Sequence, residues 1–202
     1  RAQDGALDSN VATVTLTVAP VNDPPALQDD RGTTDEDVPM TFQASQLLGN
    51  DAPGPAGPAG TGDNELGQTL TVIGVSATSA QGGTVTLSGG LITYTPPRDF
   101  SGEDKFTYQV RDNGVPPQEA QGTVTVTVVE VNDAPLAGAD FYGVAENAPL
   151  LVGGSGVLAN DTSPDGRPLT VVAQTLVTAQ GAGVQLAADG SFRYDPTRAL
   201  GL

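Results

Sequence analysis

The sequence predicts an all-β fold made of tandem Greek-key β-sandwiches, with about seven strands in each repeat. Three observations predict it: short segments in which apolar and polar residues alternate, frequent turn residues, and an internal repeat. The 202 residues include 26 Gly and 16 Pro but only 4% aromatic residues. This composition favours short strands with many reversals, and a core built mainly from small apolar side chains.

The strands of one full repeat are marked by alternation with a period of two residues, which is typical of a half-buried antiparallel strand. In chain order we expect strands near Ala26–Thr34 and at Met40–Phe42, Thr69–Val75, Thr84–Leu87, Leu91–Tyr94, Lys105–Val110 and Thr123–Val128. A single helical turn is expected at Ser45–Gly49. This number of short strands, separated by turn signals, indicates an Ig-like sandwich, although paired Cys and a buried Trp are missing from the sequence.

The same alternation assigns the core. Phe106, Tyr108 and Val110 share one strand face, and in the last strand the valines of 124–128 face inward while the threonines point outward. Phe100 and Tyr94 are expected to complete the aromatic part of the core. We interpret these rings as core packing in preference to a platform on which a ligand stacks.

Ordered landmarks recur along the chain. V-N-D-P-P at Val21–Pro25 returns as V-N-D-A-P at Val131–Pro135, and Asn132 follows Asn22 by 132 − 22 = 110 positions. The motif L-G-N-D at 48–51 returns at the same offset as L-A-N-D at 158–161. Later landmarks are 99 or 100 positions apart, because the first copy carries an extra loop at 52–60. These matches predict tandem repeats of one domain.

The landmarks divide the chain into three parts. Residues 1–23 are interpreted as the last strand and linker of a preceding repeat, 24–133 as a complete sandwich, and 134–202 as an incomplete next repeat. Without its last two strands, the third part would expose sheet edges. We expect it to be either disordered or paired with a strand from another chain, for which Val11–Val18 is a candidate.

Charge and composition exclude several functions. The net charge of −16 opposes binding to nucleic acid or to an anionic membrane surface and favours divalent cations, although solubility alone is an alternative explanation. No stretch approaches the roughly 20 apolar residues of a membrane span. The sequence has no His, no Cys and one Lys, Lys105. General-base and nucleophilic chemistry usually needs such groups, so we expect no enzyme activity.

The repeat junctions carry the most informative motif. Glu130-Val-Asn132-Asp133-Ala-Pro135 resembles the interdomain linker of cadherins, and E-N-A-P at Glu146 resembles a cadherin domain opening. L-A-N-D-T-S-P-D-G at 158–166 is similar to a calcium-ligand loop of those domains, and 100–114 is similar to their closing strand. In this order, the motifs resemble bacterial cadherin-like or VCBS-type tandem repeats of large secreted adhesins of the RTX type.

This resemblance implies Ca²⁺ as the cofactor, a hard cation that takes six to eight oxygen ligands. For the second junction it implies eight ligands, which come from the base of the full repeat, the linker and the next repeat: Glu36, Asp99, Glu130, Asn132, Asp133, Asn160, Asp161 and Asp165. For the first junction it implies four: Asn22, Asp23, Asp51 and Asp112. Ala134 and Ser101 depart from the cadherin pattern and imply fewer or weaker ions. The alternative is that these residues are only turn formers.

The function implied is mechanical. The chain is expected to be a calcium-dependent repeat of a secreted or cell-surface bacterial adhesin, in which Ca²⁺ and neighbouring repeats form a stiff stalk. One alternative is a cadherin-like module that binds a polysaccharide. A polysaccharide or a host or cell-surface ligand is also expected as a partner of other parts of the parent protein. Another is a spacer within a large secreted enzyme or toxin.

Overall fold

The computed structural model describes the chain except for residues 1, 4, 18–20, 56–64 and 199–202. It contains two compact units. Unit 1 comprises residues 1–97 and 102–128, and unit 2 comprises residues 98–101 and 129–202. The second unit therefore includes the linker 129–133, together with the short turn at 98–101.

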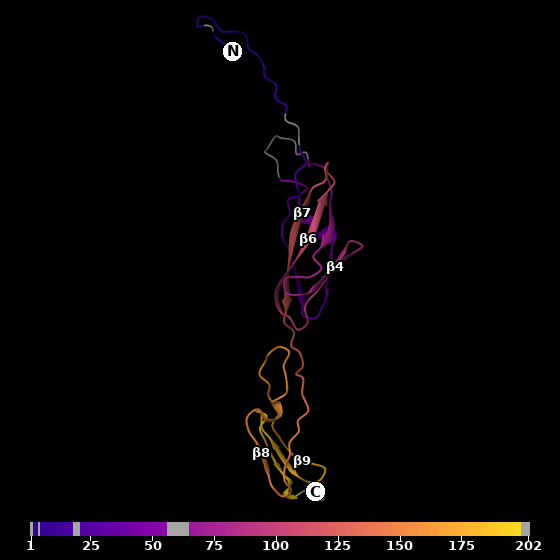
Figure 1. Ribbon diagram of the computed structural model, residues 1–202, viewed down its shortest axis with the longest axis vertical. Helices are drawn as coiled ribbons and strands as arrows, with labels where there is room; N and C mark the ends of the chain where they lie inside the picture. The colour runs from indigo at the N-terminus through magenta and orange to yellow at the C-terminus, as the bar shows by residue number, and fades with distance from the viewer. Residues whose placement is uncertain (1, 4, 18–20, 56–64, 199–202) are drawn as a thin grey trace. The chain divides into compact units, whose positions relative to one another are not determined.

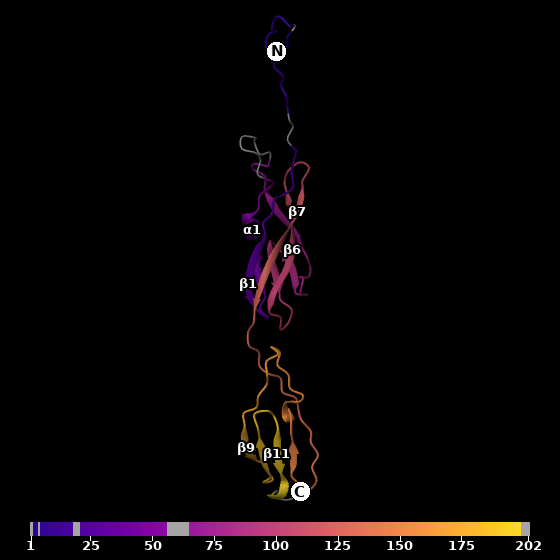
Figure 2. The same ribbon diagram turned by 90° about the vertical axis from the view of Figure 1, so that its left-hand side faces the viewer.

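Unit 1 is a sandwich of two antiparallel sheets, as the sequence predicts (Figures 1 and 2). The larger sheet has the order β1 (Asp30–Asp35), β7 (Glu119–Val129), β6 (Gly102–Asp112) and β3 (Leu70–Val75). The smaller sheet has the order β2 (Met40–Gln43), β5 (Leu91–Thr95) and β4 (Thr84–Ser88). The expected helical turn is present as α1 (Ala44–Leu47) and a 3₁₀ turn at Leu48–Asn50.

The core of unit 1 lies between these sheets. Phe106, Tyr108 and Val110 of β6 are at most 2% exposed, and they face Ile92 and Tyr94 of β5, which are fully buried. Val124, Val126 and Val128 of β7 complete the inner face. Alternation along the strands therefore places apolar side chains inward on both sheets, as the sequence predicts.

Two core predictions were wrong. Phe100 is only half-buried, and the fourth core aromatic ring is that of Phe42 in β2, whose centroid lies 5.9 Å from that of Phe106. Thr125 was expected to point to solvent but is buried. It lies in the middle of an eleven-residue strand whose neighbours β1 and β6 flank it on both sides, so its outer face is not fully open.

Two strand boundaries also differ from expectation. Strands β6 and β7 are longer than the alternating segments, because they pair with each other over ten residue positions from Gly102↔Val128 to Arg111↔Glu119. The first strand begins only at Asp30, and Ala26 forms an isolated bridge with Ala52. Pairing with β7 therefore determines the position of β1 more than its own weak pattern does.

Unit 2 repeats the smaller sheet of unit 1. Its sheet has the order β8 (Leu150–Val152), β11 (Phe192–Asp195), β10 (Gly183–Leu186) and β9 (Gln174–Val177). The order β8-β11-β10 matches β2-β5-β4 strand for strand. The pair Val177↔Gly183 also matches the bridge Thr78↔Thr84, because 177 − 78 and 183 − 84 both equal 99. The two units thus share local structure as well as sequence landmarks.

The expected strand at Val11–Val18 is not formed in the described residues. Residues 11–17 are exposed and have no strand assignment, and Val18 lies outside the described residues. The physical reason is pairing, because a segment becomes a strand only beside a hydrogen-bonding neighbour. Whether this segment pairs with another chain remains a prediction.

Candidate metal centre

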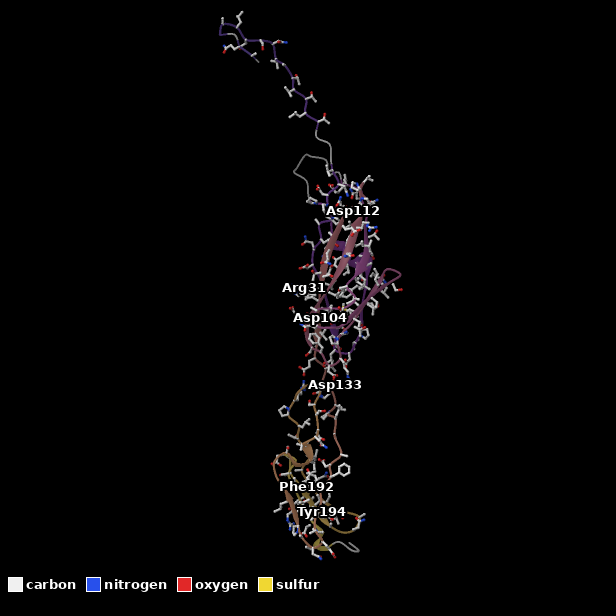
Figure 3. The ribbon with its side chains drawn as sticks, in the orientation of Figure 1. Arg31, Asp104, Asp112, Asp133, Phe192 and Tyr194 are labelled. Atoms are coloured by element: carbon white, nitrogen blue, oxygen red, sulfur yellow. The ribbon has the colours of Figure 1, made fainter. Side chains whose placement is uncertain are left out.

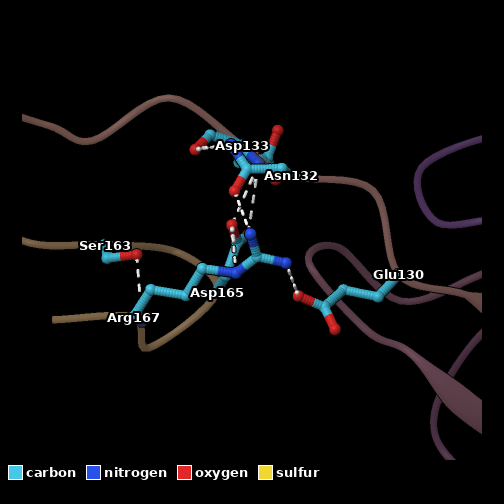
Figure 4. Close-up of polar contacts among 6 residues, drawn as sticks. All are labelled: Glu130, Asn132, Asp133, Ser163, Asp165 and Arg167. Carbon is cyan, nitrogen blue, oxygen red and sulfur yellow. Dashed lines mark hydrogen bonds and ion pairs between the residues drawn. The ribbon is translucent and has the colours of Figure 1, made fainter.

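The second linker, which follows β7, is held by an arginine of unit 2 (Figure 4). The guanidinium of Arg167 donates from Nη2 to Glu130 Oε1 at 2.6 Å and from Nη1 to Asn132 Oδ1. Its Nε lies 3.7 Å from Oδ2 of Asp165. The Ser163 hydroxyl accepts a hydrogen bond from the backbone N–H of Arg167 at 3.2 Å, which fixes the start of that side chain. Three of the predicted ligands are therefore gathered around one cation.

Asp133 is the centre of the carboxylate cluster. Its backbone N–H donates to both carboxylate oxygens of Asp165, at 3.3 and 3.1 Å. Carboxylate oxygens of Asp133 and Asp165 lie within 4.8 Å of each other, and so do those of Asp133 and Asp99. The side chain of Asp165 is only 3% exposed. Like charges held this close, and partly out of water, favour a cation among them.

Asp99 reaches this cluster from the turn at 98–101. Its backbone has a φ of 53°, in the left-handed region that Asp tolerates better than most residues. Arg98 Nε lies 3.4 Å from Asp99 Oδ2, but this arginine side chain is 84% exposed. Such an exposed ion pair holds the carboxylate only weakly.

The remaining predicted ligands of unit 2, Asn160 and Asp161, form hydrogen bonds with the backbone at the start of the repeat. Asp161 Oδ1 accepts the backbone N–H of Gly138 at 2.8 Å, and Asn160 donates to the carbonyl of Ala139 at 2.9 Å. These contacts tie the loop after the 3₁₀ turn at Gly156–Leu158 to the chain that follows the linker. Both side chains therefore have a structural role in the protein without metal.

The first linker has a corresponding arrangement inside unit 1, next to the labelled Asp112 at the end of β6 (Figure 3). Asn22 Nδ2 donates to both oxygens of Asp112, at 3.2 and 3.1 Å, and to the carbonyl of Pro116 at 2.9 Å. Asp112 also accepts the backbone N–H groups of Gly114 and Gln118. A Cβ on Gly114 would lie 2.0 Å from Asn22 Oδ1, so the glycine leaves the space that Asn22 occupies.

Further carboxylates of unit 1 contact the first linker and the residues that follow it. The backbone N–H of Asp23 donates to Glu65 Oε1 at 3.2 Å, and Glu65 is buried. Asp51 accepts the backbone N–H of Gln28 at 2.9 Å and the hydroxyl of Tyr108 at 3.2 Å. That hydroxyl also donates to Asp30 at 2.9 Å.

The pKa values of Asp30 and Tyr108 are both shifted. Burial raises the pKa of Asp30 above its ordinary value, and Asp51 raises it further, while the hydrogen bond from Tyr108 acts in the opposite direction. The pKa of Tyr108 is raised, first by burial and then by its hydrogen bond to Asp30. Both shifts have the sign expected where a group loses water and faces negative charge.

Glu36, the remaining predicted ligand, lies in unit 1 in the turn after β1, and its side chain is buried. The adjacent Asp37 has a φ of 58°, which permits this tight turn. A buried carboxylate is unusual and normally needs polar or charged partners.

Sequence reasoning missed three residues that the structure places at the linkers: Glu65, Gln68 and Arg167. Gln68 Nε2 donates to Asn22 Oδ1 at 2.6 Å, just as Arg167 donates to Asn132 Oδ1. The repeat offset could have revealed this pair, because 167 − 68 = 99 is the offset that relates Leu70 to Leu169. Glu65 follows the inserted loop, and the residue 99 positions after it is Pro164 and not a carboxylate.

The donor groups fit a hard cation. The linker side chains supply carboxylate and amide oxygens, which are the ligands that calcium prefers, and the sequence has no His or Cys for a softer metal. Among the described residues, no helix is long and apolar enough to cross a membrane.

Two families match the sequence. The bacterial Ig domain family matches residues 22–128, and the bacterial cadherin-like domain family matches residues 132–200. Both are families of structural domains and not of enzymes. None of the curated proteins compared with the chain matches its sequence significantly.

Solved structures that resemble the chain include two protocadherins. The extracellular domain of protocadherin gamma B4 has 16% identity and a TM-score of 0.46, with 90% of this chain and 30% of that chain covered. Extracellular cadherin domains 3–6 of protocadherin gamma B2 have 19% identity and a TM-score of 0.44, with 90% and 45% covered.

An endo-fucoidan hydrolase of glycoside hydrolase family 107 shares 13% identity at a TM-score of 0.32, with 88% of this chain and 25% of that chain covered. The chain thus spans less than half the length of each of these three proteins. Because the Ig match covers more than half of the sequence, and the cadherin-like match follows it, the chain belongs to the bacterial Ig domain family and continues into a bacterial cadherin-like repeat.

Proposed function

We propose that the chain is a calcium-dependent structural repeat region of an extracellular bacterial adhesin and forms part of a stalk. The observation that carries this proposal is the gathering of oxygen donors at both linkers, with the same Asn and Asp at each. Bacterial Ig and cadherin-like domains are typically extracellular. In that compartment, calcium at millimolar concentration can occupy modules with dissociation constants of about 10⁻⁴–10⁻³ M.

At the second linker the proposed ligands are the side-chain oxygens of Glu130, Asn132, Asp133, Asp99 and Asp165. At the first linker they are those of Asn22, Asp23 and Asp112. Glu36, Asp51, Asn160 and Asp161 complete the proposed set. Bound calcium would neutralise the clustered carboxylates, whose mutual repulsion otherwise loosens the linker.

The mechanical consequence follows from the linker chemistry. Each linker contains Pro directly or one residue after its Asp, which restricts the backbone to extended conformations. A cation that binds side chains of the linker and of the following repeat would remove much of the remaining freedom. A series of such repeats would then act as a stiff spacer that carries a binding domain away from the cell.

The test is calcium titration of the whole chain, followed by small-angle scattering and by thermal unfolding. We expect millimolar CaCl₂ to increase the maximum dimension and the melting temperature relative to chelator, whereas NaCl at equal ionic strength does neither. Asp133→Asn should abolish most of the response. Asp189→Asn is the matched control, because Asp189 is an exposed turn residue that contacts Ser191. Equal responses of the two variants, or none in the wild type, would refute the proposal.

A second candidate function has one observation in its favour. Phe141 in unit 2 is 91% exposed, and exposed aromatic rings are typical of carbohydrate-binding surfaces. A polysaccharide-binding module would retain a glycan on an array, and a stalk repeat would retain none. A spacer within a larger secreted enzyme or toxin remains an alternative prediction.

A further inference from the structure

Arg167 lies where the proposed calcium ligands of the second linker come together. Its guanidinium contacts one carboxylate, one amide and a second carboxylate, from Glu130, Asn132 and Asp165 (Figure 4). The planar fork of an arginine suits this task, because its N–H groups point in fixed directions toward separate acceptors. One side chain thereby links both ends of the linker segment 130–132 to the loop at 163–167.

This contact is more than an ordinary surface ion pair. Exposed pairs contribute little, and the side chains of Arg167 and Glu130 are 53% and 48% exposed. However, Asp165 is almost buried, and it also accepts the backbone N–H of Asp133. A positive charge near Asp165 therefore stabilises the carboxylate that holds the linker backbone.

The first linker has a neutral side chain at the matching position. Gln68, which precedes Arg167 by 99 residues, donates to the Oδ1 of Asn22 as Arg167 donates to that of Asn132. The backbone N–H of each linker Asp is likewise held by a loop carboxylate, Glu65 for Asp23 and Asp165 for Asp133. The two linkers thus share these two hydrogen bonds, and they differ in charge: the second has the guanidinium of Arg167 in place of Gln68, and the carboxylate of Glu130 in place of Pro20.

We propose that Arg167 is the internal cation of the second linker: it holds Glu130, Asn132 and Asp165 in place without metal, and it makes this linker bind calcium more weakly than a neutral residue would. The statement about calcium affinity rests on the proposed function. Calcium affinity depends on the number of charges that the ligands supply, and a guanidinium already neutralises part of that charge. Calcium and the arginine contacts therefore oppose each other, and each weakens the other to the same extent.

The first test measures calcium binding at each linker separately. Titration of the whole chain with CaCl₂, followed by NMR of the backbone amides of Asp23 and Asp133, reports on the two linkers individually. Arg167→Gln introduces the residue of the first repeat, and we expect calcium to bind at Asp133 about tenfold more tightly, as removal of one nearby positive charge predicts. The affinity reported by Asp23 should not change.

Two further variants serve as controls. Arg193→Gln removes an arginine from the sheet of unit 2, where it pairs with Asp195, and should leave the affinity at Asp133 unchanged. Gln68→Arg makes the reverse exchange and should weaken binding at Asp23. If Arg167→Gln and Arg193→Gln give the same calcium affinity at Asp133, the arginine does not oppose the metal and that half of the proposal is overturned.

The second test needs no calcium. In chelator, Arg167→Gln should make the amide hydrogen of Asp133 exchange at least about threefold faster than in Arg193→Gln, because Asp165 loses its positive partner. Faster exchange supports the metal-free role of Arg167, whether or not the linkers respond to calcium. If neither linker responds to calcium, the proposed function is refuted, but the metal-free role is not. Unchanged exchange would overturn the metal-free role.

Discussion

Asp104 is the most deeply buried charged residue of the described chain, at 1% exposure, and it lies within unit 1 (Figure 3). Its carboxylate accepts hydrogen bonds from the hydroxyls of Ser79 and Tyr94 and from the backbone N–H groups of Gln81 and Lys105. A buried carboxylate is tolerated when each oxygen has partners of this kind. Because Tyr94 lies in β5 and Asp104 in β6, this one carboxylate links the two sheets, and it also holds the loop after β3.

Replacement of this carboxylate should therefore be costly. We expect Asp104→Ala to destabilise unit 1 by about 3 kcal/mol, because several buried donors would lose their acceptor. Urea unfolding followed by circular dichroism measures the change. Glu103→Ala is the control, since Glu103 is an exposed neighbour in the same strand, and it should cost less than about 0.5 kcal/mol. Similar midpoints for both variants would contradict this role.

At the level of single residues, the sequence predicted which side chains gather at the second linker better than it predicted their hydrogen-bond partners. Asn132 and Asp133 stand out because they repeat at a domain junction, and Asp165 because its loop at 158–166 is similar to a calcium-ligand loop. Arg167 does not, because an arginine beside a turn looks like a solvated surface residue until the fold brings it to the linker. Hydrogen-bond partners far apart in the sequence leave no periodic signal.

Among the elements, the β6–β7 pair is the longest ladder of unit 1, and one position in it leaves no room for a side chain. Gly122 lies directly opposite Tyr108, and a Cβ there would come within 2.4 Å of the tyrosine ring. The ring is fully buried, and its hydroxyl donates to Asp30 and Asp51. It therefore has little freedom to move aside.

We expect Gly122→Ala to destabilise unit 1 by about 2 kcal/mol through overpacking. The matched control is Gly74→Ala in β3, where the new Cβ would meet only Gln109 Oε1 at 3.4 Å, and the cost should stay below about 1 kcal/mol. Thermal unfolding of both variants gives the comparison. A control as unstable as Gly122→Ala would show that strand glycines matter here for a reason other than space.

Strand identity was predictable from the sequence because period-two alternation is a local property. β2, β4 and β5 begin where the pattern begins. The ends of β6 and β7 were not predictable, since they depend on how far the two strands pair and not on their own residues.

For the whole molecule, the main difference between the units is the amount of buried apolar surface. Among the described residues, and leaving proline aside, the buried aliphatic and aromatic side chains belong to unit 1 except for Ala182. Phe192 and Tyr194 of β11 are only half-buried in unit 2. Stability is not uniform across a structure, and segments with few buried contacts open more readily.

Hydrogen exchange of the whole chain should show this difference. We expect the amides of β6 and β7 to exchange at least about tenfold more slowly than those of β8–β11. Mass spectrometry of peptic fragments measures both sets in one sample, and the exposed segment 11–17 provides the fully exchanging reference. Equal protection of the two sheets would mean that they unfold together as a single cooperative unit.

The hydrogen bonds of each linker have a practical consequence for recombining these modules. Asn22 and Asp23 are anchored by side chains that come later in the chain, and Asp133 is anchored in the same way by Asp165. Each linker is therefore structurally part of the domain that follows it. Recombined or shortened arrays should be joined just before Asn22 and Asn132. A junction placed after the proline would separate the linker from the side chains that form hydrogen bonds with it.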